Sequence, residues 1–295
     1  MTGIDEIIRK ADVLVEALPY IADFKGEIIV VKLGGSVQED EQALRSILLD
    51  VAFMRVVGML PIVVHGGGKA ITRALGASGI ETKFVQGLRV TDEPTLQVME
   101  HVIKDEVNAQ IVDFLNRDSV SAVPLPGDRV FFALKKTAKD PATGAPLDWG
   151  YVGNPVACDT GPVRELLHQK KIPVICPIGL GEDAHHYNIN ADTAAAAIAK
   201  ALPARKLAYV SDVPGLLRDK DDPSSLIETL HIDDVDGLIR DGVIAGGMLP
   251  KIESCLEALR AGVRKVHLVD GRMPHSLLLE IFTQKGVGTQ IVKQK

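Results

Sequence analysis

Three glycine-rich segments each stand beside a lysine in this 295-residue chain: KLGGS at 32–36, HGGGKA at 65–70 and AGGMLPK at 245–251. Glycine lets the backbone approach an anion, and the N–H groups that begin a following helix can bind it. One such segment is weak evidence, since a glycine after a strand is usually only a turn. Two that follow successive strands, with Lys32 and Lys69 beside them, favour a phosphate site.

The usual nucleotide-binding fingerprints do not explain these segments. The sequence contains neither G-x-x-x-x-G-K-[ST] nor G-x-G-x-x-G. These patterns mark the P-loop and the dinucleotide-binding turn. The chain is therefore neither a P-loop NTPase nor an ordinary dinucleotide dehydrogenase.

Two further segments carry polar side chains that could complete a site. In YNINADTAAAAIA, at 187–199, Asn190 is interpreted as a helix cap, whereas Asn188 and Asp192 favour a site. A carboxylate placed between two lysines would hold their ammonium groups in position. In GLRVTD, at 87–92, Arg89 is either an exposed edge residue or a side chain that grips a carboxylate with two N–H groups.

Short β-branched runs alternate with helical patterns, which predicts a largely parallel sheet with helices on both faces. In such a sheet, ligands bind at the carboxyl ends of the strands. Segments 80–91 and 120–156 are instead predicted to form hairpins added to the sheet edge. The strands are expected at 28–33, 61–64, 173–176, 206–210 and 265–269, and the helices near 41–57, 69–78, 94–116, 160–169, 191–200, 232–241, 247–261 and 274–283.

The first 25 residues do not fit this sheet and predict a separate helix, with Thr2 and Asp5 near its start resembling a cap. Its apolar residues follow the spacing of one helical stripe: Ile4, Ile7, Ile8, Ala11, Leu14, Val15 and Leu18. Either the stripe packs on its own domain or it docks on another subunit. Both interpretations stay open at the level of the sequence.

Composition argues against a protein that binds nucleic acid, holds zinc, spans a membrane or is secreted. The net charge is -6 and the isoelectric point about 5.8, which argues against a nucleic-acid surface. The three cysteines show no C-x-x-C spacing, which fits a reducing compartment and disfavours a zinc site. No apolar run approaches a membrane span of about 20 residues, and the N-terminus lacks the apolar stretch of a signal peptide. A cytoplasmic protein that binds neither membrane nor nucleic acid is expected.

The motifs KLGG, HGGGKA, GLRVTD, NINAD, SDVPGL and GGMLPK stand in the order and roughly the spacing of the N-acetyl-L-glutamate kinases. The chain resembles this branch of the amino acid kinase superfamily from about residue 18 to its C-terminus. The resemblance implies a three-layer α/β/α sandwich with a largely parallel central sheet, edge hairpins and an N-terminal helix. It implies an N-terminal helix at 1–25, an acetylglutamate-binding lobe at 26–202 and an ATP-binding lobe at 203–295. Segment 118–155 departs from the family pattern.

The resemblance also implies an activity and a role for each matching residue. The expected reaction is ATP- and Mg²⁺-dependent phosphorylation of the side-chain carboxylate of N-acetyl-L-glutamate, in arginine biosynthesis, with no metal ligand from protein side chains. The implied roles are catalysis for Lys32, Lys251 and Asp192; substrate binding for Gly67, Gly68, Arg89 and Asn188; phosphate binding for Gly34 and Gly35; and ATP binding for Ser211, Asp212, Gly215, Gly247 and Met248.

Regulation is implied by the two ends of the chain. The N-terminal extension with EALPYI, at 16–21, resembles that of arginine-inhibited members, which form hexamers as trimers of dimers. The segment 275–291 resembles their arginine site, where Glu280, the backbone near Gly288 and Lys206 would hold the effector. The open alternative is that Glu280 is an exposed helix residue and the tail is only packing.

Two other functions are compatible with the motifs. One is a kinase for an aminoadipate or glutamate group linked to a carrier protein. The other, from a different class, is a non-catalytic arginine or nucleotide sensor that has kept the fold, against which the intact Lys32, Asp192 and Lys251 speak.

Overall fold

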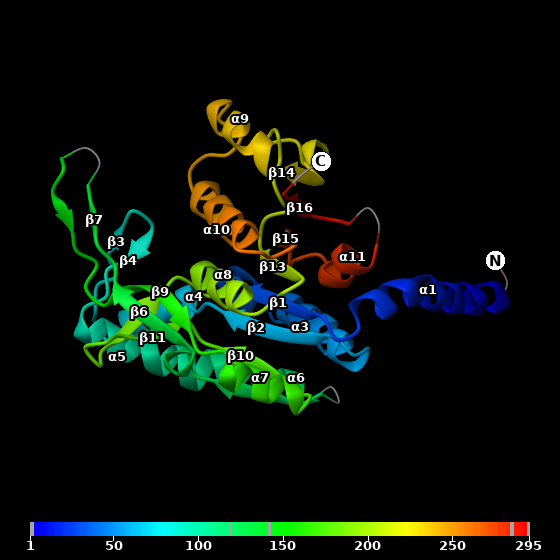
Figure 1. The fold of residues 1–295 in the computed structure, drawn as a ribbon, viewed down its shortest axis with the longest axis horizontal. Helices are drawn as coiled ribbons and strands as arrows, with labels where there is room; N and C mark the ends of the chain where they lie inside the picture. The colour runs from blue at the N-terminus through cyan, green and yellow to red at the C-terminus, as the bar shows by residue number, and fades with distance from the viewer. Residues whose placement is uncertain (1–2, 118–119, 141–142, 284–285, 294–295) are drawn as a thin grey trace.

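A central eight-stranded sheet organises the chain in the computed structural model, which describes residues 3–117, 120–140, 143–283 and 286–293 (Figure 1). The strand order is β14-β16-β15-β13-β1-β2-β10-β5. Strands β14 and β16 run opposite to the other six. The strands are β1 (Ile28–Leu33), β2 (Leu60–His65), β5 (Ala122–Leu125), β10 (Ile172–Ile175), β13 (Lys206–Ser211), β14 (Thr229–His231), β15 (Lys265–Asp270) and β16 (Thr289–Val292).

Helices cover both faces of this sheet, as the alternation of strands and helices predicts, and the layers make the expected α/β/α sandwich. One face carries α7 (Gly161–His168), α8 (Ala191–Ala201), α9 (Val235–Arg240) and α10 (Met248–Arg260). The other carries α3 (Glu41–Val56), α4 (Gly68–Ala77), α5 (Glu93–His101), α6 (Asn108–Arg117) and α11 (Ser276–Phe282). Short helices lie at α2 (Gly35–Glu39), η2 (Gly127–Arg129), η3 (Pro223–Ser225) and η4 (Ile232–Asp234).

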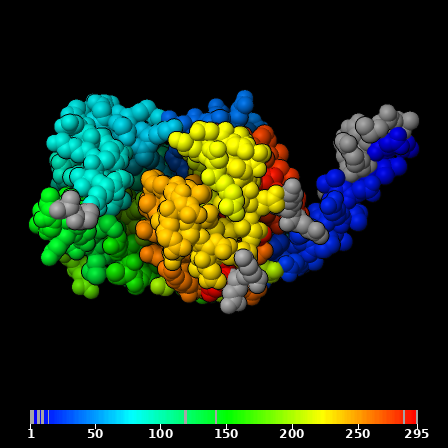
Figure 2. Space-filling view, turned by 90° about the horizontal axis from the view of Figure 1, so that it is seen from above, coloured from blue at the N-terminus to red at the C-terminus, as the bar shows by residue number. Residues whose placement is uncertain are grey.

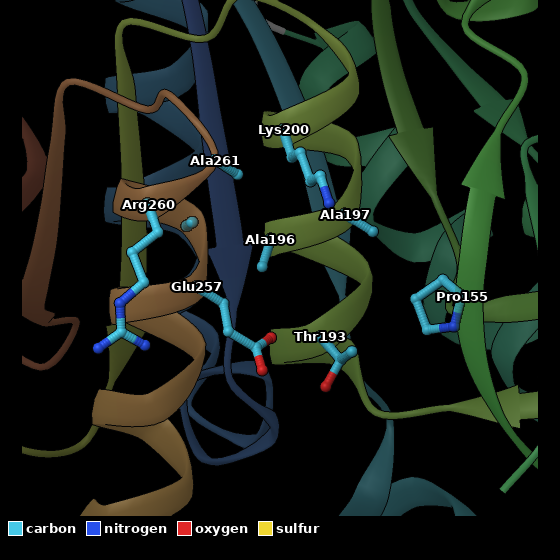
Figure 3. A pocket seen from close by; sticks show the side chains of 9 residues that line it. Pro155, Thr193, Ala196, Ala197, Lys200, Glu257, Arg260 and Ala261 are labelled. Carbon is cyan, nitrogen blue, oxygen red and sulfur yellow. The ribbon is translucent and has the colours of Figure 1, made fainter.

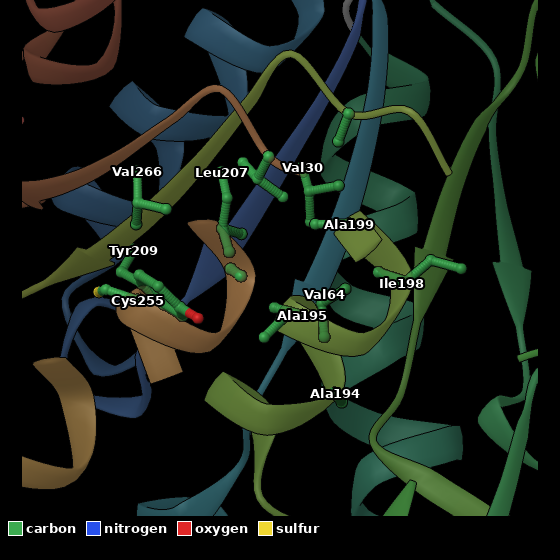
Figure 4. Close-up of a cluster of buried hydrophobic side chains, with 14 of the residues drawn as sticks. Val30, Val64, Ala194, Ala195, Ile198, Ala199, Leu207, Tyr209, Cys255 and Val266 are labelled. Carbon is green, nitrogen blue, oxygen red and sulfur yellow. The ribbon is translucent and has the colours of Figure 1, made fainter. Parts of the chain in front are cut away.

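The core is divided by the sheet into two layers because successive side chains of a strand point to opposite faces. Val30 of β1 packs with the α8 and α10 side, whereas Ile29 and Val31 pack with the α3 side. Figure 4 shows the first layer, where Val30 and Val64 meet small alanines of α8. Those alanines let α8 lie close to the sheet, which brings the start of the helix near the end of β1.

The prediction for segment 120–156 was wrong in part. Its first piece is β5, which joins the main sheet as a parallel edge strand and not as a hairpin. The rest helps to close a separate four-stranded barrel, whose strands are β6 (Phe131–Lys135), β9 (Val152–Cys158), β11 (Ile178–Leu180) and β12 (His186–Ile189). Two ribbons lie beside it: β3 (Phe84–Val85) with β4 (Leu88–Arg89), and β7 (Ala138–Lys139) with β8 (Pro146–Leu147).

The expected boundary between residues 202 and 203 falls in the connection from α8 to β13. Strand β13 pairs with β1, so the parts before and after the boundary share one continuous sheet. The division into an acetylglutamate-binding lobe and an ATP-binding lobe stays a prediction. No helix in the described part of the chain is long and apolar enough to cross a membrane.

The N-terminal helix α1 (Gly3–Phe24) projects from the body of the molecule (Figures 1 and 2). Its C-terminal end is anchored to the body: Phe24 is buried edge-on against Phe282, and Arg205 pairs with Asp23. The described members of the predicted stripe, Ile4, Ile8, Ala11, Val15 and Leu18, are exposed. These described members of the stripe therefore do not pack on the chain's own domain, and the side chains of Ile7 and Leu14 lie outside the description. Thr2, predicted as part of the cap, lies outside the described residues.

Candidate active site

Three ionised groups from three elements meet in the structure. Lys32 near the end of β1, Asp192 in the first turn of α8 and Lys251 in the first turn of α10 form a chain of ion pairs. Lys32 Nζ lies 2.7 Å from Asp192 Oδ1, and Lys251 Nζ lies 3.3 Å from Asp192 Oδ2. Sequence reasoning expected this arrangement, in which one carboxylate fixes two ammonium groups.

Burial and charge set the ionisation of the trio. Burial raises the pKa of Asp192, but the two lysines more than offset it, and the net pKa lies below its usual value. Burial lowers the pKa of Lys32, and the Asp192 charge opposes that change only in part. The pair of lysines is thus held by a firmly ionised carboxylate.

Tyr209 on β13 supports the trio and was missed by sequence reasoning. It is fully buried, its hydroxyl donates to the Asp192 carbonyl at 3.2 Å, and its ring centroid lies 5.5 Å from Lys251 Nζ. The parallel register places it directly beside Lys32. The only sequence signal was its position in a predicted strand, which does not tell a site residue from a core residue.

The first two glycine segments face one another. Gly34 donates its N–H to the Val210 carbonyl at 2.8 Å, and a Cβ there would lie only 2.9 Å from that oxygen, so only glycine lets the loop pass so close to β13. A Cβ on Gly35 would lie 3.6 Å from the Gly68 nitrogen. Helices α2 and α4 begin at Gly35 and Gly68, so two helix N-termini converge where an anion would be stabilised.

A cavity of about 420 Å³ opens beside these loops. Its walls come from α4, the β3–β4 ribbon, α5 and β12, and include six of the residues predicted for the substrate, phosphate and catalytic roles. These six are Lys32, Gly35, Gly67, Gly68, Arg89 and Asn188. Figure 2 shows a deep cleft between the cyan part of the chain and the yellow and orange C-terminal part.

Arg89 lines this cavity and is not an exposed edge residue. Only 7% of its surface is accessible. Its guanidinium donates to the Gly68 carbonyl at 3.0 Å, to Thr72 at 2.9 Å and to Thr82 at 3.2 Å, and it lies 4.8 Å from the Phe84 ring centroid. Burial lowers the pKa of Arg89. These contacts fix the side chain at the cavity wall as a rigid cation.

The two asparagines before α8 have different surroundings. Asn190 caps the helix, as predicted, because its side chain accepts from the N–H groups of Asp192 and Thr193. Asn188 on β12 lines the cavity and donates to Thr91 Oγ1 at 3.3 Å. The cap holds the first turn of α8, and with it Asp192, in place.

A second hollow, of about 680 Å³, lies in the C-terminal part of the chain and is lined by segment 213–220 together with Gly242, Val243, Ala245 and Met248. Gly215 and Met248 line it, whereas Ser211, Asp212 and Gly247 are not among its walls. Ser211 is buried beside Gly34, and the Asp212 charge raises the pKa of Lys32. Gly247 immediately precedes α10. Because Met248 and Lys251 share the first turn of α10, this hollow adjoins the lysine trio.

Two other hollows lie apart from the trio. Figure 3 shows one between α8 and α10, where Lys200, Glu257 and Arg260 border a floor of alanines. None of the residues predicted for the site lines it. The other, of about 320 Å³, lies at the base of α1 and is lined by Lys206 and Glu280.

Glu280 is buried, which contradicts its interpretation as an exposed helix residue. Its carboxylate accepts from His267 Nδ1 at 2.7 Å and from the N–H groups of Val287 and Gly288 at 2.8 and 2.9 Å. Burial raises the pKa of Glu280, but these bonds outweigh it and the net pKa is lowered. Burial lowers the pKa of Lys206 to about 8. Tyr20, at the end of α1, lines the same hollow and was missed in the sequence.

The profile of the amino acid kinase family matches residues 27–270. An acetylglutamate kinase from Heliobacterium modesticaldum is 49% identical over 97% of this chain and 99% of its own length. One from Akkermansia muciniphila is 41% identical over 99% of this chain and 98% of its own.

Among solved structures, an N-acetylglutamate synthase from Neisseria gonorrhoeae, complexed with coenzyme A and N-acetyl-glutamate, superimposes with a TM-score of 0.83 at 28% identity. The match covers 96% of this chain and 63% of the synthase. Profile, relatives and fold agree over nearly the whole chain. The chain therefore belongs to the amino acid kinase family and, within it, to the acetylglutamate kinases.

Proposed function

We propose that this chain transfers the γ-phosphoryl group of ATP to the side-chain carboxylate of N-acetyl-L-glutamate, a step of arginine biosynthesis. The activity follows from membership of the acetylglutamate kinases. The observation that supports the assignment of residues is the Lys32–Asp192–Lys251 trio beside a cavity walled by Arg89.

The reaction requires little acid–base chemistry from the protein. A carboxylate is ionised at neutral pH, so one of its oxygens attacks the γ-phosphorus while the bond to the β-phosphate oxygen breaks and ADP leaves. What needs stabilising is the negative charge on the transferred group. Lys32 and Lys251 supply positive charge, and Asp192 positions them. The N–H groups of the loops at Gly34–Gly35 and Gly67–Gly68 supply hydrogen bonds.

Substrate binding is assigned to the wall opposite the lysines. Arg89 presents a fixed guanidinium that suits the α-carboxylate of acetylglutamate, and Asn188 offers an amide to the backbone end of the same molecule. ATP is assigned to the hollow walled by Gly215 and Met248, with its base away from the trio. The region between this hollow and the lysines is assigned to Ser211, Asp212 and Gly247, where they would contact the nucleotide.

Mg²⁺ is assigned to the nucleotide and not to a protein cage. In the described part of the chain, no group of three or more histidine, cysteine or carboxylate side chains could hold a metal. Mg²⁺ in kinases commonly binds through substrate phosphates with few protein ligands. When bound, it would neutralise charge on the β- and γ-phosphates.

We further propose that L-arginine binds in the hollow at the base of α1 and inhibits a hexameric enzyme. Glu280 lies there as a lowered-pKa carboxylate suited to a guanidinium, and Lys206 lies there as a cation suited to a carboxylate. A related synthase structure, 26% identical with a TM-score of 0.79, is complexed with coenzyme A and L-arginine. The exposed stripe of α1 supports docking on a second copy, which links the hollow to assembly.

A coupled assay of ADP release tests the function. ATP and Mg²⁺ are supplied with acetylglutamate, glutamate or aspartate, and the expected result is turnover with acetylglutamate alone. Turnover only with a carrier-linked glutamate or aminoadipate would show that the enzyme acts on carrier-linked acceptors and not on free acetylglutamate. No turnover with any acceptor, together with arginine binding by calorimetry, would make the chain a sensor.

A further inference from the structure

His65 ends β2 directly before the glycine loop and is completely buried. It is not itself among the residues that line the cavity, and the reaction described above gives it no role. Its Nδ1 lies 2.8 Å from the Gly66 carbonyl, and its Nε2 lies 2.9 Å from the Asn108 side-chain nitrogen. Both ring nitrogens are therefore engaged, and the question is which one carries the proton.

The carbonyl of Val174 decides which ring nitrogen of His65 is protonated. Asn108 Nδ2 also lies 2.9 Å from the carbonyl oxygen of Val174 on β10. A carbonyl only accepts, so the amide must turn its NH₂ group toward Val174 and donate there. The second hydrogen of that NH₂ then points at His65 Nε2, which must be an acceptor. The remaining ring nitrogen, Nδ1, carries the proton and donates to Gly66.

The arrangement also excludes a charged ring. An imidazolium would place an N–H on Nε2 against the Asn108 NH₂, so two donors would face each other. Burial lowers the pKa of His65 to about 4, in agreement with a neutral ring. Asn108 Oδ1 has no hydrogen-bond partner among the described residues, which shows that the amide is oriented by its donors alone.

The bond to Gly66 controls the loop that lines the cavity. In a trans peptide the C=O and the following N–H point in opposite directions. Holding the Gly66 carbonyl toward the buried ring turns the Gly67 N–H to the side away from the ring. Gly67 in turn packs on Ile103, because a Cβ there would lie 3.3 Å from that side chain.

The same helix supplies both supports. Asn108 ends a π-helical turn, η1 (Val102–Val107), and its N–H donates to the Ile103 carbonyl, five residues back. Such turns are rare and frequently occur at functional sites. The wider turn places Ile103 under Gly67 and the Asn108 amide beside His65, so one local irregularity braces the loop at two points.

We propose that His65 and Asn108 are positioning residues for phosphoryl transfer: they hold the Gly66–Gly68 loop so that its N–H groups face the transferred phosphoryl group. The hydrogen bonds form a chain from Val174 through Asn108 and His65 to Gly66, here called the relay, in which each group fixes the orientation of the next. This inference rests on the proposed function, in which the glycine loops bind the transferred phosphoryl group. It adds the side chains that set the shape of one of these loops.

Two substitutions of His65 separate its two bonds. In His65→Asn, the amide nitrogen is as many bonds from the backbone as Nδ1 and keeps a donor for Gly66. In His65→Gln, the amide reaches the position of Nε2 and keeps a partner for Asn108, but the Gly66 donor is lost. We expect kcat at least tenfold lower for His65→Gln than for His65→Asn, with KM for ATP within threefold of wild type in both.

Asn116→Ala is the matched control, because Asn116 lies on the same helix and bonds both backbone groups of Ala122, away from the loop. It is expected to lose stability without losing kcat. Equal kcat values for the two His65 variants would overturn the proposal. If wild type turns over acetylglutamate while the two variants match, only this inference fails, not the proposed function.

The tautomer is measured on the wild-type enzyme, so the proposal does not depend on how a variant folds. In protein labelled with ¹⁵N-histidine, the His65 signal is identified by its absence from His65→Asn. The expected pattern is a neutral ring protonated at Nδ1, unchanged between pH 8 and pH 5.5. A ring protonated at Nε2, or one that becomes charged above pH 5.5, would contradict the relay.

Discussion

At the scale of single residues, Lys251 is expected to matter for turnover and little for folding. Lys251→Ala leaves Asp192 paired with Lys32 at 2.7 Å, so no buried charge is left alone. Removing one donor to a developing anion costs on the order of 10²–10³ in kcat. The measurement is kcat by coupled assay with a melting curve, using Lys200→Ala on the exposed side of α8 as the control. A kcat near wild type would remove Lys251 from the catalytic group.

Arg89→Lys is expected to weaken acetylglutamate binding more than ATP binding. A lysine cannot make a two-pronged contact, and it also loses the bonds to Gly68 and Thr72. The loss of a charged hydrogen bond is about 1.5–3 kcal/mol, which raises KM by about one to two decades. Arg73→Lys, on the exposed face of α4, is the control. A rise in KM for ATP alone would place Arg89 in the nucleotide site.

At the scale of elements, the junction of β2 with α4 is expected to make stability fall in acid. The pKa of His65 is lowered from 6.5 to about 4 in the folded chain, so the unfolded chain binds more protons between these values. Stability therefore rises with pH across that window and is lost as pH falls. The loss between pH 7 and pH 5 is about 2 kcal/mol for this group.

Urea unfolding at fixed protein concentration measures this dependence. His65→Asn is expected to be less sensitive to pH over the same interval, because the titrating group is gone. If wild type and variant lose the same free energy of unfolding between pH 7 and pH 5, His65 is not the group responsible.

The elements show what the sequence could predict. Strands β1, β2, β10, β13 and β15 were predicted because each is a short, mostly apolar run of buried residues, rich in Ile and Val in β1, β2 and β10. Strand β5 was missed because it is short and contains Pro124, which suits an edge. The barrel was missed because its closure depends on pairings between distant segments, such as Leu180 with Phe132.

In the site, too, some residues could be predicted from local sequence and others could not. Lys32, Asp192 and Lys251 could be placed together because the motifs KLGG, NINAD and GGMLPK resemble those of the acetylglutamate kinases, which implies a shared role. Tyr209, Thr72 and the His65–Asn108 pair could not, since their roles come from contacts across the sheet and not from local pattern. The π-helical turn leaves no mark in the apolar spacing, and 94–116 was predicted as one continuous helix.

At the scale of the whole molecule, α1 is expected to join dimers into a hexamer. Leu18 and Val15 are 61% and 68% exposed, which is unfavourable for a stripe of this length unless another surface covers it. Deleting residues 1–22 is expected to leave active dimers with a weakened arginine response, because Tyr20 is also removed from the hollow at the base of α1, where arginine is proposed to bind.

Light scattering and an arginine titration on full-length and truncated protein measure this outcome. The acetylglutamate-dependent kcat of the truncated protein is the internal control and is expected to stay near that of the full chain. A full-length dimer indifferent to millimolar arginine would refute the regulatory proposal and leave the catalytic one intact.

The order of strands also has a consequence for synthesis. Strand β1 is the first strand made, yet it lies in the middle of the sheet between β2 and β13. After β2 has paired, the other edge of β1 waits until the ribosome has added the residues up to Lys206. At about 5–20 residues per second this takes roughly seven to thirty seconds. An inward-pointing lysine discourages an open edge from pairing with another chain. Lys32, near the end of β1, would therefore disfavour pairing of this open edge with another chain before the enzyme has any substrate to bind.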